Sequence, residues 1–386
     1  MLDLKLIRTQ PEMIRALIKR RHATADLDTL LAADERTRSL TAQIDQLRSK
    51  RKGGGPPQGK DKEAAAAEAR EAAVALRNEI AALEEELRAA KAERDAQVNL
   101  LPNLFPDDTP VGESDKDNVE IKRWGEQPKF DFEPKTHEVI GQKLGVIDEE
   151  RGTKVAGSGF YYLTGDGARL AWGMYTLALD YLAKRGFRQM FTPVLAREQT
   201  LFGTGYLPFF RDQIYRIQGE DLNLIGTSEQ TLVGYHMEEI VAPEKLPLQY
   251  TAFTPCFRTE SGSYGRETRG LFRQHQFHKV EQIVFCEPDK SDEWLTKTLE
   301  NAEGILQLLE IPYRVVRVCD GDMGAPGYKK YDVEGWFAGF GSYRETHSCT
   351  NLTDFQTRRL NIRCKSGKET FMDWEEAKRQ LRSRRK

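Results

Sequence analysis

Two long stretches near the start of the chain repeat apolar or small residues at alternating steps of three and four. The first series is Leu30, Ala33, Thr37, Leu40, Ile44 and Leu47. The second series is Ala69, Ala73, Leu76, Ile80, Leu83, Leu87 and Ala90. This spacing is typical of a coiled coil, and the run GGGPPQG at 53–59 breaks any helix between the two series. The sequence therefore predicts an antiparallel helical hairpin with arms of roughly 25–35 residues, or about 40–50 Å.

A shorter helix is predicted ahead of the hairpin. Thr9 and Glu12 have the spacing of a capping box, and Pro11 falls in the first turn, where its missing N–H costs little. We therefore expect Thr9 to cap a helix that starts near Pro11.

After about residue 130, helical and strand patterns alternate. Helical patterns lie at 168–186 and 289–310. Strand patterns lie at 187–196, 246–259, 275–288, 312–319 and 358–364. Strand patterns that follow one another closely favour a largely antiparallel sheet, and prolines with Asp and Gly mark 106–130 as a linker. The sequence thus predicts a hairpin at 1–105, a linker at 106–130 and an α+β domain at 131–386.

The composition restricts the class of protein. A chain of 386 residues suits two domains, and a net charge of −2 gives no overall field that would attract nucleic acid. The five cysteines form no CxxC pair, which argues against a disulfide framework and a zinc ribbon. No apolar run of about 18 residues and no signal-peptide pattern occur, so we expect no membrane span and a cytoplasmic location.

Local clusters of charged residues are more informative than the net charge of the chain. The turn of the predicted hairpin is flanked by Arg48, Lys50, Arg51, Lys52, Lys60 and Lys62. A solvated surface is the ordinary explanation of such a run. Contact with an RNA backbone is the alternative, because a projecting basic rod can follow phosphates without reading bases. Charge alone leaves both interpretations open.

A second cluster, FRTESGSYGRETRGLFRQHQF at 257–277, has the residue types that bind a nucleotide. Arginines such as Arg258 and Arg273 suit phosphate oxygens, Glu260 can accept from an exocyclic amine, and Phe277 offers a face for a ring. No P-loop and no G-x-G-x-x-G helix start occurs, so a different nucleotide fold is needed. A surface hairpin with salt bridges is the alternative explanation of the same residues.

The stretch FRTESGSYGRETRGLFRQHQFHKVE resembles motif 2 of the seryl-tRNA synthetases, a family of class II aminoacyl-tRNA synthetases. Further stretches that resemble this family are GTGYLP (203–208), YDVE (331–334), YRE (343–345) and DFQTRR (354–359). The resemblance implies a class II antiparallel sheet flanked by helices, with the hairpin as a tRNA-binding arm. It also implies ATP-dependent activation of L-serine, transfer to tRNA(Ser), and a homodimer with Pro193 at its interface.

The resemblance assigns roles to individual residues. It implies catalytic roles for Arg258, Arg273 and Glu345. ATP would be bound by Arg258, Thr259, Glu260, Gln274, Phe277, Glu345, Thr346, His347 and Ser348. Serine would be bound by Thr227, Ser228, Glu229 and Glu281. Glu345 and Ser348 would hold Mg²⁺, and tRNA would contact the basic turn of the hairpin together with Arg266 and Arg269.

The chain departs from the family pattern in three places. Thr346 and His347 stand where the family usually has Ile and Ser, and Ser228 stands in place of a small alanine. After Phe371 the sequence shows no motif 3, the segment that supplies a serine ligand and a γ-phosphate arginine in this family. We therefore expect a catalytic domain shortened at its C-terminus, with uncertain activity.

Three functions remain compatible with these residues. The first is a serine–tRNA ligase. The second is a catalytically impaired paralogue that serves as an RNA-binding or regulatory protein. The third is an enzyme that aminoacylates another acceptor, which the tRNA-type arm disfavours.

Overall fold

The computed structural model describes residues 2–52, 62–261 and 270–365 of the chain. Its internal contacts divide it into two compact units, residues 2–101 and the residues from Pro102 onward. Each unit has a hydrophobic core of its own, with Leu30 in the first and Val333 in the second among the fully buried residues.

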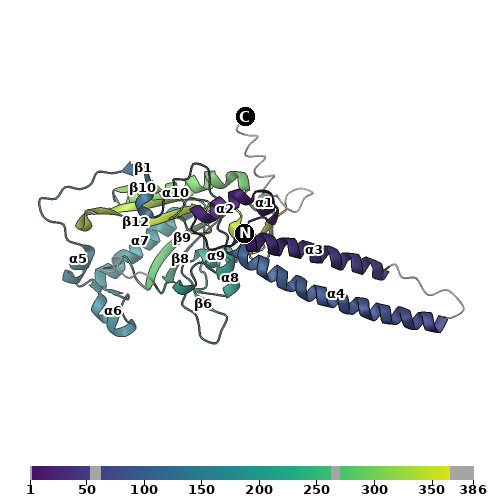
Figure 1. Ribbon diagram of the computed structural model, residues 1–386. Coiled ribbons are helices and arrows are strands. Elements are labelled where there is room, and N and C mark those ends of the chain that lie inside the picture. Colours follow the sequence, from purple (N-terminus) through teal and green to yellow (C-terminus); the bar gives the residue numbers. More distant parts are fainter. Residues whose placement is uncertain (1, 53–61, 262–269, 366–386) are drawn as a thin grey trace. The chain divides into compact units, whose positions relative to one another are not determined.

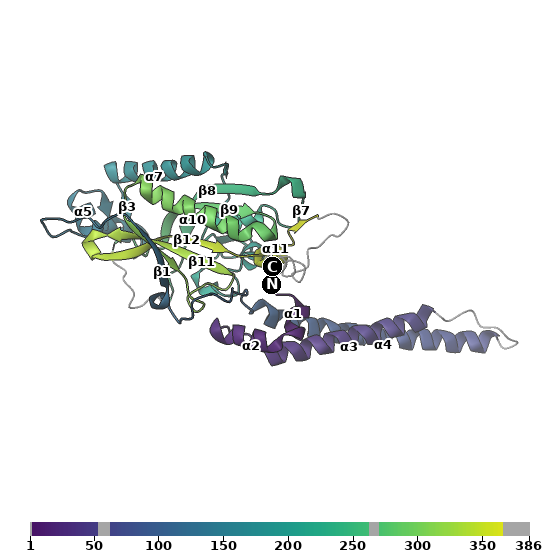
Figure 2. The ribbon, with the colours of Figure 1, turned by 90° about the horizontal axis from the view of Figure 1, so that it is seen from above.

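The first unit is built from helices. They are α1 (Leu4–Thr9), α2 (Pro11–Arg20), α3 (Leu27–Lys52) and α4 (Lys62–Asn99). Helices α3 and α4 contain 26 and 38 residues, which correspond to about 39 and 57 Å at ~1.5 Å per residue. They lie side by side along most of their length (Figures 1 and 2). The predicted helical hairpin is confirmed.

The predicted apolar seam is buried along most of α3. The buried positions there are Leu30, Ala33, Thr37, Leu40 and Ile44. On α4, Ile80 and Ala90 are buried, whereas Ala73 is exposed. The ion pairs between Arg48 and Glu84 at 2.7 Å and between Arg36 and Glu86 at 3.5 Å also join the two helices. The heptad pattern therefore located the contact between the arms but overstated how far it extends on α4.

Thr9 does not cap the second helix, which corrects the expectation from sequence. It ends α1, and its hydroxyl donates to the carbonyl oxygen of Lys5 at 2.9 Å. Helix α1 starts upstream of the predicted helix because Asp3 caps it, accepting from the backbone N–H of Lys5 at 2.7 Å, and because Leu6 and Ile7 are buried. Pro11 is the first residue of α2, as predicted.

The second unit contains two main sheets. The larger has the order β1 (Val119–Trp124), β10 (Tyr313–Arg317), β11 (Lys329–Phe337) and β12 (Ser342–Asn351), and all of its pairs are antiparallel. The other has the order β4 (Arg188–Gln189), β8 (Leu248–Phe257) and β9 (Gln276–Phe285). Strands β8 and β9 form a ten-residue antiparallel ladder from Leu248↔Phe285 to Phe257↔Gln276. The predicted antiparallel sheet is confirmed, and the short β4 is parallel to β8.

Helices cover one face of each main sheet. Helix α10 (Ser291–Leu308) shares a hydrophobic cluster with Tyr313, Val315 and Val333, and it lies along the larger sheet (Figure 2). Helix α7 (Gly165–Ala183) packs on β8 and β9 through Tyr175, whose ring centroid is 4.5 Å from that of Phe253. The opposite faces of the strands are therefore left for polar side chains.

Smaller elements complete the second unit. Its short helices are α5 (His137–Lys143), α6 (Glu149–Ala156), α8 (Glu198–Gly203), α9 (Glu229–Gly234) and α11 (Phe355–Arg359). Its short strands are β2 (Ile147–Asp148), β3 (Tyr162–Leu163), β5 (Leu195–Ala196), β6 (Asn223–Leu224), β7 (Ile240–Val241) and β13 (Arg363–Cys364). Its 3₁₀ turns are η1 (Asp115–Asp117), η2 (Arg211–Gln213), η3 (Pro243–Lys245), η4 (Pro288–Lys290) and η5 (Ala338–Phe340).

Three segments differ from the sequence-based prediction. The segment 106–130, predicted to be a linker from its prolines with Asp and Gly, contains β1, whose six residues are all exposed. The predicted strand at 187–196 is reduced to β4 and β5. The predicted strand at 358–364 begins as helix α11, because Phe355 and Leu360 are both buried on its inner side.

Among the helices within residues 2–52, 62–261 and 270–365, none is both long and apolar enough to span a bilayer.

Candidate active site

Strand β9 presents the central residues of the candidate site on one face. Side chains alternate along a strand, so Phe277, Lys279 and Glu281 point to the same side, away from the face on which His278 contacts Tyr175 of α7. The β8 residues paired with them are Cys256, Thr254 and Ala252, which are all buried. An aromatic ring, an ammonium and a carboxylate therefore follow one another along β9, next to three small buried side chains of β8.

Arg258 lies at the end of β8 above this row. Its guanidinium carbon is 5.1 Å from the centroid of the Phe277 ring, and Nη2 donates to the Tyr206 hydroxyl at 3.3 Å. Burial raises the pKa of Tyr206, and the nearby Tyr206 in turn raises the pKa of Arg258. The Nε of Arg258 is buried without a hydrogen-bond partner among the described residues. A buried donor of this kind needs an acceptor, and a phosphate oxygen would supply one.

Glu260 and Arg273 face each other across the start of the loop between β8 and β9. Their carboxylate and guanidinium form a short ion pair. Glu260 adopts φ of +50°, a left-handed conformation that is uncommon for a residue other than glycine. Such strain often marks a functional position. Thr259 is anchored to η2, where its N–H donates to the carbonyl oxygen of Gln213 at 3.1 Å.

Further along β9, Glu281 accepts two hydrogen bonds on one oxygen. Thr227 Oγ1 donates to Oε2 at 2.7 Å, and Lys279 Nζ lies 2.5 Å from the same atom. Burial, the largest single influence, lowers the pKa of Lys279, but Glu281, Cys256 and Tyr206 together outweigh it and raise the pKa to about 12. Lys279 is therefore a firmly charged ammonium inside the site.

A second carboxylate lies close to Glu281. Glu229, the first residue of α9, is half-buried, and burial followed by repulsion from Glu281 raises its pKa. Gln356 of α11 donates to Glu229 Oε1 at 2.6 Å and holds the side chain in place. Ser228 is fully buried, and its hydroxyl has no hydrogen-bond partner among the described residues. Two neighbouring carboxylates of this kind favour a cationic ligand.

Strand β12 brings Glu345 and Ser348 to one face although they are three residues apart. The register pairs Glu345 with Glu334 and Ser348 with Asp332, and the ladder shifts by one residue at Thr346. The extra residue is a β-bulge, which changes the alternation of side chains. His347 is paired with Val333 on the face covered by α10, and burial lowers its pKa to about 4. A bulge therefore explains the three-residue spacing.

The polar face of the larger sheet is acidic. Burial, followed by the nearby Asp332, raises the pKa of Glu345, and Lys330 contacts Asp332 at 3.1 Å. Among residues 2–52, 62–261 and 270–365, no three His, Cys, Asp or Glu side chains lie close enough together to hold a metal ion. One carboxylate and one hydroxyl still fit Mg²⁺, because this ion is usually held by one or two carboxylates together with substrate phosphates and water.

The basic residues assigned to tRNA are only partly described. Arg48 pairs with Glu84 and keeps 54% of its side chain exposed, and Lys50 is exposed. Lys60, Arg266 and Arg269 lie outside the described residues, as do the side chains of Arg51, Lys52 and Lys62. The segment after Lys365, in which the sequence shows no motif 3, also lies outside them.

Sequence reasoning missed several residues of the site. Tyr206, Lys279, Asp332 and Gln356 contact the assigned residues. Lys279 lies in the same strand as Glu281, whereas Gln356 is 127 positions from Glu229. Lys279 gave the one usable signal, since strand alternation places it between Phe277 and Glu281. Tyr206, Asp332 and Gln356 fall within the stretches GTGYLP, YDVE and DFQTRR, but only the tertiary structure shows which assigned residues they contact.

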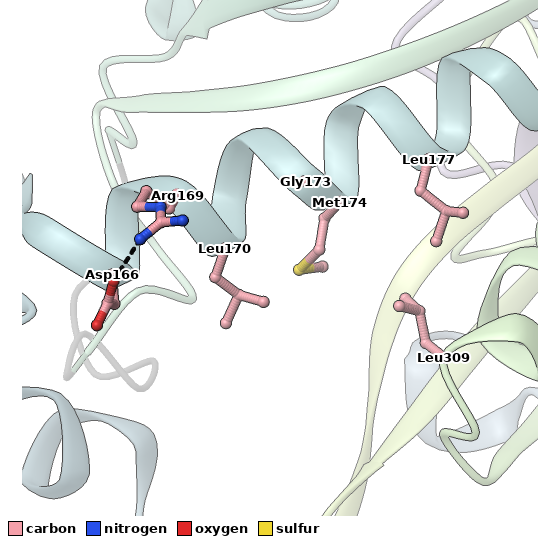
Figure 3. Close-up of a pocket in the computed structure, with 7 residues that line it drawn as sticks. All are labelled: Asp166, Arg169, Leu170, Gly173, Met174, Leu177 and Leu309. Atoms are coloured by element: carbon pink, nitrogen blue, oxygen red, sulfur yellow. Dashed lines mark hydrogen bonds and ion pairs between the residues drawn. The ribbon is translucent and has the colours of Figure 1, made fainter.

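A separate apolar hollow of about 510 Å³ lies along α7. Its lining is Asp166, Arg169, Leu170, Gly173, Met174, Leu177 and Leu309. Figure 3 shows the Leu170, Met174 and Leu177 side chains projecting from the same side of α7, with Leu309 opposite Leu177. None of these residues belongs to the candidate site. The exposed fractions of Leu170 and Trp172, 67% and 62%, instead indicate a surface for association.

Comparison with known proteins assigns both units. Residues 1–105 match the model of the seryl-tRNA synthetase N-terminal domain, and residues 213–372 match the class II tRNA synthetase core domain of the G, H, P, S and T enzymes. The chain is 43% identical to a serine–tRNA ligase of Caldanaerobacter subterraneus over 94% of this chain and 86% of the relative. It is 44% identical to a serine–tRNA ligase of Rubrobacter xylanophilus with the same two shares.

Solved structures agree with these relatives. The seryl-tRNA synthetase of Pyrococcus horikoshii, complexed with ATP, superposes with a TM-score of 0.88 at 37% identity, covering 95% of this chain and 88% of that one. The cytoplasmic serine–tRNA ligase of Naegleria fowleri, in complex with AMP, gives 0.83 at 32% identity, covering 96% of this chain and 86% of that one.

Proposed function

The chain belongs to the seryl-tRNA synthetase family, and from this premise we propose that it is a serine–tRNA ligase acting through the site on β8, β9 and β12. Serine is activated with ATP to seryl-adenylate, with release of pyrophosphate, and is then transferred to tRNA(Ser). The observation that carries this proposal is Arg258, whose guanidinium lies over the Phe277 ring and whose buried Nε has no hydrogen-bond partner among the described residues.

The phosphates and base of ATP have complementary groups in the site. Arg258 and Arg273 supply guanidinium donors for phosphate oxygens, where charge develops as the serine carboxylate attacks the α-phosphorus. Phe277 offers its ring to the adenine, and Glu260 can accept from the adenine amine. Arg273 forms an ion pair with Glu260, so we propose that an ATP phosphate competes with Glu260 for this guanidinium.

Serine fits the neighbouring pair of carboxylates. Its ammonium would neutralise Glu229 and Glu281; burial, followed by repulsion from Glu281, raises the pKa of Glu229. Thr227 orients Glu281 through the 2.7 Å hydrogen bond, and Lys279 stays charged next to it. No protein nucleophile is needed, because the serine carboxylate itself forms the new bond. Catalysis then rests on orientation and charge stabilisation.

We further propose that Glu345 and Ser348 hold Mg²⁺, which would neutralise phosphate charge when bound. Their placement on one face of β12 by the bulge at Thr346 supports this assignment. A cytoplasmic location follows from a role in protein synthesis.

For tRNA, we propose that the helical hairpin of residues 2–101 is the binding arm. Its basic turn and the matched family domain support this role. The exposed apolar surface of α7, together with the fully exposed Phe191 and nearby Pro193, supports a homodimer. No feature of the described residues favours the impaired paralogue.

Serine-dependent ATP–pyrophosphate exchange, measured beside tRNA(Ser) charging, tests the proposal. We expect both activities, and exchange that is specific for serine over alanine and threonine. A protein that binds tRNA but shows no exchange would contradict the ligase and support the RNA-binding alternative.

A further inference from the structure

Helix α5 begins at His137, beside the residues that follow the loop between β8 and β9. The backbone N–H of Leu271 donates to His137 Nε2 at an N···N distance of 2.7 Å. An imidazole nitrogen accepts a hydrogen bond only while it carries no proton. Because Leu271 is two residues ahead of Arg273, this bond fixes the backbone immediately before an arginine of the phosphate site.

The neighbouring Gly270 shows how tightly the two segments fit. It has φ of +68°, and a Cβ at this position would lie 2.2 Å from His137 Nε2 and 2.8 Å from Glu138 Oε2. Its carbonyl oxygen accepts from Gln274 Nε2 at 2.6 Å. Only glycine satisfies both the conformation and the space, so the backbone there has little freedom to move relative to α5.

Aromatic contacts extend the connection to β12. The Phe272 ring meets His137 edge to face, with centroids 5.0 Å apart, and meets Phe340 with centroids 5.3 Å apart. The Arg344 guanidinium lies over both phenylalanine rings, at 5.2 and 5.0 Å. Arg344 directly precedes Glu345. His137 therefore contacts a cluster that lies between Arg273 on one side and the proposed metal ligand on the other.

We propose that His137 is a positioning residue for ATP binding. As a hydrogen-bond acceptor, it sets the backbone at Leu271 and so the reach of Arg273. This inference rests on the proposed function, since it takes Arg273 as a phosphate ligand. The expected size of the effect of losing this hydrogen bond follows from the sensitivity of active sites, in which a misplacement of about 1 Å can lower the rate about 10²-fold.

Three variants separate the acceptor from the ring. His137→Phe keeps an aromatic ring against Phe272 and removes the acceptor. His137→Gln removes the ring and keeps an acceptor near the place of Nε2, and His137→Ala removes both. Val139→Ala is the matched control, because Val139 lies on the same helix and is 46% exposed. For each full-length variant, the ATP dissociation constant is measured by calorimetry, and KM values for ATP and serine are measured by pyrophosphate exchange.

We expect the Phe and Ala variants to weaken ATP binding about 10- to 100-fold, with the serine KM within about twofold of the starting protein. The Gln variant and the Val139→Ala control should stay within about threefold for ATP. The inference is overturned if His137→Phe binds ATP normally, if Gln is as weak as Phe, or if ATP and serine weaken equally.

A measurement without variants covers the case in which a variant does not fold. The ¹⁵N spectrum of the histidine side chains in the unmodified protein should show His137 Nε2 without a proton, and a protonated Nε2 overturns the inference. Calorimetry also separates the two proposals. A protein that binds ATP in a His137-dependent way but performs no exchange would refute the ligase and retain the positioning role, whereas a protein that binds no ATP would refute both.

Discussion

Replacing Lys279 by methionine should destabilise the second unit by about 2–4 kcal/mol. Lys279 Nζ lies 2.5 Å from Glu281 Oε2. The pKa of the ammonium is raised from 10.5 to about 12, because Glu281, with smaller contributions from Cys256 and Tyr206, outweighs burial. That difference corresponds to about 2 kcal/mol at ~1.36 kcal/mol per pKa unit. Removing one member of a buried pair also leaves the other charge uncompensated, which typically costs about 3–5 kcal/mol. Partial solvent access to Lys279, 33% of its side chain, reduces both figures.

The contribution of this pair depends on pH in a defined direction. Because the pKa of Lys279 is higher in the folded than in the unfolded state, the stabilisation is complete below about 10.5 and is lost as the pH rises through about 12. Unfolding in urea at pH 7.5 therefore measures its full value. Tryptophan fluorescence reports on the correct unit, since all 5 tryptophans of the sequence lie after Pro102.

A double-mutant cycle with Glu281→Gln isolates the pair. We expect the double variant to be less destabilised than the sum of the single variants by about 1–2 kcal/mol. The matched control is Lys184→Met, which removes an exposed lysine and should change the stability by no more than about 0.5 kcal/mol. Effects of Lys279→Met and Glu281→Gln that add within about 0.5 kcal/mol would refute the reasoning.

Four further predictions concern activity and assembly. Arg258→Ala should lower the rate of serine-dependent exchange about 10²–10³-fold, and an unchanged rate would contradict its role at the phosphates. The serine KM should rise as the pH falls, because burial and Glu281 raise the pKa of Glu229 and a protonated carboxyl binds an ammonium poorly; Glu229→Gln should flatten this profile, and a profile that keeps its slope would be evidence against the assignment. Replacing 48–62 with a short Gly-Ser turn should lower tRNA charging about tenfold or more through lost phosphate contacts while exchange stays within about twofold; equal loss of both would argue against the arm. Leu170→Glu should shift sedimentation from dimer to monomer, and a dimer of unchanged stability would exclude the α7 surface.

The fold was predictable where the signal is local. The heptads of the two arms and the alternation in β8 and β9 are properties of contiguous residues, and both elements formed as expected. Strand β1 was missed because the Pro, Asp and Gly residues of 106–130 indicated a linker, although Val119 and Ile121 alternate with Glu120 and Lys122. The predicted strand at 358–364 forms only at Arg363–Cys364. Arg358 and Arg359 instead end helix α11, where Phe355 and Leu360 are both buried.

The site was predictable to the extent that one motif contains it. Arg258, Glu260, Arg273 and Phe277 lie within 20 residues, and the structure places them around one strand pair. Tyr206 could not be found in the same way. Its contact with Arg258 spans 52 positions, and no sequence pattern links the two residues.

The bulge at Thr346 reverses which residues of β12, odd-numbered or even-numbered, point to the polar face of the sheet. On the Glu345 side of it, odd-numbered residues share the polar face, while on the Ser348 side even-numbered residues do, as the pairing with Glu334 and Asp332 requires. Deleting Thr346 would restore a regular strand and would look harmless in a sequence alignment. It would also turn either Glu345 or Ser348 into the hydrophobic layer beneath α10. The number of residues in this strand therefore cannot change by even one. Any transfer of β12 to another protein must include the bulge as well as the side chains.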